Sequence, residues 1–372
     1  MSLQRAAQAA LAGRNGSRLI LIAATLFAVF SVSCGGSSKS KATHNAYVTL
    51  PQLGSVALLH INDSSGAISA VSQTAPVLGT SPVGLALHPS KKFLYVANSG
   101  PAGNTVSIFN VASDGSLTDT GVTAATGSGP RAAVIDPSGK FLLVTNNLTN
   151  DISVFSIDSG GALTEVSGSR FPAGASPTDL RITPSGKFVY VANPNSGLIL
   201  GFSLGADGAL TSLGAPFSAR AGVAAIAIDA GEHFLYTANA TDASVSAFTI
   251  DSGSGALTEI TGSPFPAGTA PRGIGIDPAT KFLYVANQGS NNISGFTIAA
   301  DGELTAMTTL VTGVTAPVFL IAEPAGTFVY AGNQTGNSIS SFSYDATTGA
   351  LTAVSGSPFS IGSAPGAMVV SH

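Results

Sequence analysis

A short apolar segment that ends in asparagine recurs along the chain. Its large apolar side chains follow one another without a polar break, which is the pattern of a strand buried on both faces. The six copies read FLYVAN, FLLVTN, FVYVAN, FLYTAN, FLYVAN and FVYAGN, and they begin at Phe93, Phe141, Phe188, Phe234, Phe282 and Phe328. Their asparagines lie 46 to 48 residues apart. A period of this length, built from short strands and turns, is typical of propeller blades.

The residues around each copy predict three further strands. Around Phe282, one strand precedes the segment over 273–277 and stops at Pro278, and another follows over 292–298. Asp301-Gly302 then forms a hairpin-type turn into a last strand. We therefore expect each unit to be a four-stranded antiparallel sheet.

Counting the strands predicts how the ring closes. Seven inner strands are expected, starting at Gly84, Ala132, Asp179, Ala225, Gly273, Phe319 and Ala367. The second strands also number seven, provided that residues 46–50 form one. The chain would then enter on a second strand and end on an inner strand of the same sheet. The sequence predicts one all-β, seven-bladed propeller over residues 44–372, closed by a blade shared between the N- and C-terminal strands, with no open edge.

Composition agrees with a β-rich fold of low charge. Asp, Glu, Lys and Arg make up 9% of the 372 residues, against roughly 25% in an average soluble domain. Hydrophobic residues reach 44%, which excludes a disordered chain. Only one long apolar run is present, at the N-terminus, so a multi-pass membrane protein is also excluded.

The N-terminus is typical of a secretion signal. Three arginines precede an apolar core over residues 19–30, and small residues lead to Cys34, the single cysteine of the chain. This arrangement resembles a bacterial lipoprotein cleavage site, which implies a signal peptide over 1–33 and a lipid on Cys34. Residues 34–43 would be the lipidated cysteine and a flexible polar tether. We expect a location in the cell envelope, with the lipid as the only membrane attachment. Ordinary secretion and a retained N-terminal anchor are the alternatives.

The charge of the mature chain argues against nucleic acid as a partner. Cleavage before Cys34 removes three arginines and no acid, so the formal net charge changes from −4 to −7. Phosphate backbones require a basic face. We expect a monomer whose partner is a small anionic ligand or an envelope protein.

Four charged residues stand out where the inner strands begin. Arg131 and Arg272 occupy the same aligned position, directly after a proline, in blades three repeats apart. Asp179 and Arg181 replace the small or apolar residues of the other blades. The longer loops gather on this rim, which makes it the expected binding face. We predict an anion site formed by Arg131, Arg272 and Arg181, with Asp179 orienting an arginine or acting as a base. The alternative is that Asp179 pairs with an arginine to satisfy a buried blade junction.

Other chemistry finds little support. The acids Asp136, Asp229, Asp277 and Glu323 recur at the far end of the inner strands, where an acid typically caps the turn. The five histidines show no metal-binding spacing, and no phosphate-binding loop or nucleophile elbow is present. We expect neither a metal nor a cofactor.

The unit that runs from Pro271-Arg272-Gly273-Ile274 to the FLYVAN segment resembles the YVTN-type repeat. Residues 44–372 as a whole resemble the seven-bladed lactonase-like propellers, which include 6-phosphogluconolactonase-type proteins and muconate-lactonizing relatives. The resemblance implies hydrolysis of a sugar or muconate-type lactone, with histidines at the blade starts of the enzymatic members. Here the starts are Gly-Pro-Arg131, Ser-Pro-Thr178 and Ala-Pro-Arg272, and Asp179 is the one inner-strand acid on this rim. The leading expectation is therefore a non-catalytic binding module, and the alternative is a lactonase with Asp179 as its acid–base residue.

Overall fold

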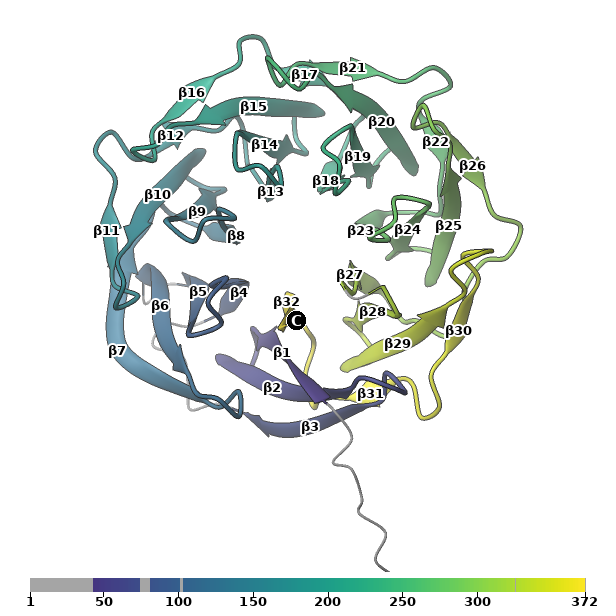
Figure 1. Cartoon of the computed structure of the whole chain (residues 1–372), viewed down its shortest axis with the longest axis horizontal. Coiled ribbons are helices and arrows are strands. Elements are labelled where there is room, and N and C mark those ends of the chain that lie inside the picture. The colour runs from purple at the N-terminus through teal and green to yellow at the C-terminus, as the bar shows by residue number, and fades with distance from the viewer. Residues whose placement is uncertain (1–42, 74–80, 101–102, 325, 372) are drawn as a thin grey trace, which may run out of the picture. The chain divides into compact units, whose positions relative to one another are not determined.

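The computed structural model describes residues 43–73, 81–100, 103–324 and 326–371, all within a compact unit over residues 41–372. Within this unit seven antiparallel sheets stand around a central axis, each with one strand next to the axis (Figure 1). The all-β seven-bladed propeller expected from the sequence is confirmed. No helix of the described part is long and apolar enough to cross a membrane.

Six sheets are formed by consecutive segments of the chain. The inner strands of these sheets are β4 (Pro82–Leu87), β8 (Pro130–Ile135), β13 (Asp179–Ile182), β18 (Val223–Ile228), β23 (Pro271–Ile276) and β27 (Pro317–Ala322). The second strands are β5 (Phe93–Gly100), β9 (Phe141–Asn146), β14 (Phe188–Asn193), β19 (Phe234–Asn239), β24 (Phe282–Asn287) and β28 (Phe328–Asn333). The third strands are β6 (Gly103–Val111), β10 (Asp151–Ile157), β15 (Leu198–Leu204), β20 (Ser244–Ile250), β25 (Asn292–Ile298) and β29 (Ser338–Tyr344).

The outer edge of most sheets is divided into two short pieces. Each piece pairs with one end of the third strand, as in the sheet where Phe155 faces Glu165 and Asp151 faces Pro172. The outer strands are β7 (Leu117–Ala125), β11 (Leu163–Glu165), β12 (Phe171–Pro172), β16 (Leu210–Ser212), β17 (Phe217–Ser218), β21 (Leu257–Glu259), β22 (Phe265–Pro266), β26 (Leu304–Ala306), β30 (Leu351–Ala353) and β31 (Phe359–Ser360). Apart from β7, these outer strands have only two or three residues and present little unpaired edge to other chains.

The seventh sheet joins the two ends of the described chain. It contains β1 (Thr43–Leu50), β2 (Ser55–Asn62), β3 (Ile68–Gln73) and β32 (Met368–Ser371), in the order β3-β2-β1-β32. Tyr47 faces Val369 across the antiparallel β1–β32 pair. The predicted closure by a blade shared between the termini is therefore confirmed.

The hydrophobic core lies between neighbouring sheets rather than at one centre. One apolar cluster, for example, joins Tyr236 and Val245 of one sheet to Leu283 and Phe296 of the next. Five tyrosines also link neighbouring sheets, because each donates its buried hydroxyl to a glycine carbonyl in the outer turn of the following sheet. These pairs are Tyr47–Gly115, Tyr95–Gly161, Tyr190–Gly255, Tyr236–Gly302 and Tyr284–Gly349, with oxygen–oxygen distances of 2.7 to 3.0 Å. Apolar packing and these hydrogen bonds hold adjacent blades together with few charges.

Candidate functional site

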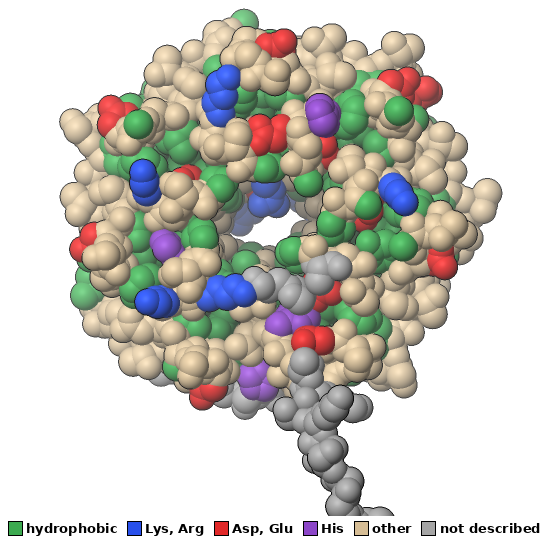
Figure 2. Space-filling view, viewed as in Figure 1, with side chains coloured by type: hydrophobic (Ala, Val, Ile, Leu, Met, Phe, Trp, Pro, Cys, Tyr) green, Lys and Arg blue, Asp and Glu red, His purple; other side chains and the backbone are tan. Residues whose placement is uncertain are grey.

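A cavity of about 630 Å³ opens where the inner strands begin. The starts of these strands and the residues after the second strands line it, and we call this region the channel mouth. Seen along the ring axis, the channel is open and Lys or Arg side chains lie inside it (Figure 2). Arg131, Arg181 and Arg272 are the basic residues that line the channel mouth.

Irregular pairing places two of these arginines at the opening. The register between inner and second strand shifts between Pro130 and Ala133 and again between Pro271 and Gly273, and Arg131 and Arg272 lie within the shifts. A bulge redirects a side chain out of the sheet's regular alternation. Close approach of β4 to β8 also requires glycine at position 84, because a Cβ there would collide with the Arg131 carbonyl.

Arg131 and Arg272 have few partners in the described part of the chain. The Arg131 side chain has no hydrogen bond or ion pair there, and the Arg272 side chain donates only its Nε, to Gln288 Oε1 at 3.2 Å. The surrounding wall takes solvent from the Arg131 guanidinium and lowers its pKa, and the positive charge of Arg272 lowers it further. Arg131 stays charged, so the channel mouth holds two cations that an anion would stabilise.

Asp179 and Arg181 fasten one blade to the next. Asp179 Oδ2 accepts the backbone N–H of Ile226 at 2.9 Å, and Arg181 Nε donates to the carbonyl of the same residue at 3.0 Å. Asp179 Oδ1 accepts the N–H of Leu180 at 2.9 Å, and Arg181 Nη2 lies 3.5 Å from Asp179 Oδ2. Both oxygens of Asp179 therefore accept backbone hydrogen bonds, as expected for a residue that satisfies a blade junction.

Gln288 and Gln334 were not singled out from the sequence. Gln288 Nε2 donates to Gln334 Oε1 at 2.8 Å, so these two amides and Arg272 form one hydrogen-bonded row on the channel mouth. Both glutamines directly follow the asparagine that ends the repeated segment. Aligning that position across the blades would have revealed them, because no other blade carries a glutamine there.

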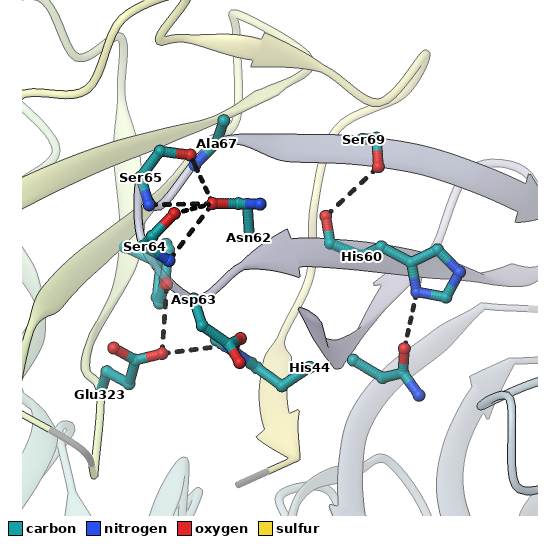
Figure 3. Close-up of polar contacts among 11 residues, drawn as sticks. His44, His60, Asn62, Asp63, Ser64, Ser65, Ala67, Ser69 and Glu323 are labelled. Carbon is teal, nitrogen blue, oxygen red and sulfur yellow. Dashed lines mark hydrogen bonds and ion pairs between the residues drawn. The ribbon is translucent and has the colours of Figure 1, made fainter. Parts of the chain in front are cut away.

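The opposite rim carries the turn-capping acids. Asp136, Asp229 and Asp277 each accept the N–H of the phenylalanine that opens the next strand, at 2.6 Å, which confirms their predicted turn role. The carboxylate of Glu323, at the equivalent position, also contacts His44, whose other ring nitrogen contacts Asp63 (Figure 3). No group of three His, Cys, Asp or Glu side chains suited to a metal ion occurs among the residues described. Cys34 and residues 34–42 lie outside the described residues.

Comparisons with known proteins agree with this architecture. The family described as "Lactonase, 7-bladed beta-propeller" matches residues 54–318 and 273–364. A 6-phosphogluconolactonase from Formosa agariphila is 42% identical over 73 residues, which are 19% of this chain and 21% of that protein. The matched stretch thus spans about a fifth of that relative.

Solved structures share the whole ring at low sequence identity. A candidate 6-phosphogluconolactonase from Bacteroides fragilis superposes with a TM-score of 0.78 at 23% identity, covering 91% of this chain and all of that one. A periplasmic gluconolactonase from Pseudomonas aeruginosa has a TM-score of 0.75 at 17% identity, covering 89% of this chain and 99% of that one. Identities this low support a common fold and not a common reaction.

Proposed function

Because the chain belongs to the family of seven-bladed lactonase propellers, we propose that it hydrolyses a lactone bearing an anionic group at the channel mouth. The observation that carries this proposal is the pair Arg131 and Arg272, two guanidiniums without an ion pair among the described residues, in one cavity of about 630 Å³. A cavity of this volume accommodates a sugar-sized molecule. Relatives named 6-phosphogluconolactonase and gluconolactonase support the choice of a sugar lactone.

The proposed chemistry uses the arginines as electrostatic catalysts. Water adds to the lactone carbonyl carbon, and the carbonyl oxygen gains negative charge that one guanidinium stabilises. The ring C–O bond then breaks, the departing oxygen takes a proton from the water that attacked, and a hydroxy acid forms. The second guanidinium holds the anionic group of the substrate by charge-assisted hydrogen bonds.

Asp179 is a positioning residue in this proposal. Its two oxygens accept the backbone N–H groups of Leu180 and Ile226, so both are already engaged in holding the blade junction. The nucleophile is therefore water from the open channel. Asp179 holds Arg181 and the blade junction below the arginine pair.

Acid release from a lactone panel tests the proposal. The purified ring should accelerate hydrolysis of 6-phosphogluconolactone and glucono-δ-lactone above the spontaneous rate, with the higher kcat/KM for the phosphorylated compound. Arg131→Ala and Arg272→Ala should each lower kcat/KM by roughly tenfold or more, since each removes a charge-assisted hydrogen bond. Ser99→Ala, which changes the rim away from the residues lining the cavity, is the matched control. A rate equal to the spontaneous one would overturn the proposal.

A second candidate function is a non-catalytic binding module for a small acid or an envelope protein. Among the described residues, those that line the channel mouth include no histidine or glutamate, and their single carboxylate, Asp179, accepts backbone hydrogen bonds, which favours this reading. Binding of 6-phosphogluconate without any acceleration of lactone hydrolysis would select it. Loss of that binding in the double variant Arg131→Ala/Arg272→Ala would place the ligand between the arginines.

We also propose that the ring works as a monomer in the cell envelope, tethered by a lipid on Cys34. The basic, apolar and small-residue order of residues 5–34 supports this location. Incorporation of a clickable fatty acid should occur in the wild type and be lost in Cys34→Ser. Equal labelling of the two chains would reject the anchor, and release of unlabelled protein from the cells would indicate ordinary secretion.

A further inference from the structure

Gln288 and Gln334 stand at equivalent positions in two neighbouring blades. Each directly follows the asparagine that ends the second strand, and the corresponding residues elsewhere are Ser99, Asn147, Pro194, Ala240 and Pro51. Such varied residues show that the fold does not require glutamine at this position. The two glutamines therefore need an explanation in terms of the channel mouth that they line.

Arg272 determines which way both amides point. A guanidinium can only donate hydrogen bonds, so Gln288 must present its Oε1 to Arg272 Nε, 3.2 Å away. The Gln288 Nε2 is then directed to Gln334, which must present its own Oε1 at 2.8 Å. The Nε2 of Gln334 consequently has no partner among the described residues, and it is a donor at the end of the row.

We infer that Gln334 is a specificity-determining residue of the channel mouth and that Gln288 positions it. The hydrogen bond from Arg272 fixes the orientation of the Gln288 amide, and that amide in turn fixes the orientation of the Gln334 amide. This inference rests on the proposed use of the channel mouth as the substrate site. Arg131, the Nη groups of Arg272 and the Nε2 of Gln334 offer donors only. A carboxylate, phosphate or hydroxy-acid oxygen can accept from all of them, whereas a protonated amine meets both unpaired donors and like charge.

Binding of 6-phosphogluconate, measured by calorimetry, tests the inference apart from catalysis. Gln334→Met keeps the length of the side chain and removes its donor, so the dissociation constant should rise by roughly tenfold. Gln288→Glu presents oxygens to both neighbours, so Gln334 must rotate and direct its Oε1 outward. Because Glu also pairs with Arg272, we expect this variant to bind more weakly than Gln334→Met. Both side chains are partly or fully exposed, so melting temperatures should stay unchanged.

A double-mutant cycle separates this relay from a simple effect of charge. If Gln288 acts through Gln334, the effects of Gln288→Glu and Gln334→Met should not multiply in the double variant. Gln52→Glu adds a carboxylate to the channel mouth away from Gln288 and Gln334, so it measures how much an added negative charge alone weakens the binding of 6-phosphogluconate. Asn147→Ala, at the equivalent position of a blade outside the relay, should bind as the wild type does.

Three results would overturn the inference: no binding of 6-phosphogluconate by the wild type, binding within twofold of wild type in Gln334→Met, or full multiplicativity in the cycle. If the variants bind 6-phosphogluconate as expected but the wild type hydrolyses no lactone, only the proposed reaction is rejected. The two proposals can therefore fail independently.

Discussion

His44 Nε2 lies 2.9 Å from Glu323 Oε1, so the first described strand is fastened to the sheet that precedes it around the ring. His44 belongs to β1, and Glu323 directly follows β27. The Nδ1 of His44 lies 2.7 Å from Asp63 Oδ1, and Tyr330 donates its hydroxyl to Glu323 Oε1 at 3.4 Å. One imidazole thus contacts two carboxylates at the junction that closes the ring.

This contact predicts a pH-dependent stability. Burial lowers the pKa of His44, but the hydrogen bonds and charges of Glu323 and Asp63 outweigh burial and raise this pKa above its usual 6.5. A raised folded-state pKa adds stability that is complete below about pH 6.5 and is lost as the pH rises through the raised value. Urea unfolding of wild type and His44→Gln should differ by about 2 kcal/mol near pH 5.5 and by less near pH 8.5. An equal difference at both pH values would contradict the ion pair.

Asp179→Asn should lower stability more than it lowers activity. An amide keeps one acceptor oxygen and turns a donor toward the N–H of Leu180 or Ile226, which leaves a buried donor unpaired. The expected cost is about 1–3 kcal/mol in the free energy of unfolding. Lactone hydrolysis per folded molecule should fall only a few-fold. A loss of hydrolysis by several orders of magnitude at unchanged stability would instead make Asp179 the catalytic base.

Tyr284→Phe should destabilise the ring without affecting ligand binding. The substitution removes the buried hydroxyl that donates to the Gly349 carbonyl at 2.8 Å, with an expected cost of about 1 kcal/mol. Tyr344→Phe is the matched control, because the Tyr344 hydroxyl has no hydrogen bond among the described residues. If thermal unfolding shows the same decrease in melting temperature for both variants, the buried tyrosine hydroxyls contribute little to the contacts between blades.

Removing residues 367–372 should open the ring. The truncation deletes β32 and leaves the inner side of β1 without the partners that now face Asn45 to Val48. We expect a broad, low-temperature unfolding transition in calorimetry in place of a cooperative one. Met368→Ala, which removes one buried side chain and keeps the strand, should keep a cooperative transition with a cost of about 2 kcal/mol or more. A sharp transition in the truncated chain would argue against strand closure.

Repetition explains why the fold could be predicted from the sequence. The FLYVAN-type segment occurs six times and predicts the same buried strand in six blades. The partial units at the two ends, around Tyr47 and Val369, together form the seventh blade. The arginines at the blade starts were found in the same way, as departures from an aligned column. Arg131 and Arg272 do line one cavity, as the alignment suggested.

The repeat does not predict contacts between residues at different aligned positions of the blades. His44 and Glu323 meet only because the ring closes, and no local pattern links residues so distant in the chain. The hydrogen bond from the Ile226 N–H to Asp179 joins two different sheets, and the repeat within one sheet does not predict it. An alignment of the blades would reveal Gln288 and Gln334 as unusual residues. Their role depends on the hydrogen bonds from Arg272 to Gln288 and from Gln288 to Gln334, which the structure alone shows.

Pairing of β1 with β32 makes the position of the chain ends around the ring arbitrary. Asn45 faces Ser371, so a short linker could join the described ends, Thr43 and Ser371, without moving a strand. New termini could then be opened in an outer turn of another blade, such as the one at Gly208. A circular permutant of this kind would have all seven sheets formed by the same strand pairs, with a different blade assembled from both ends of the chain.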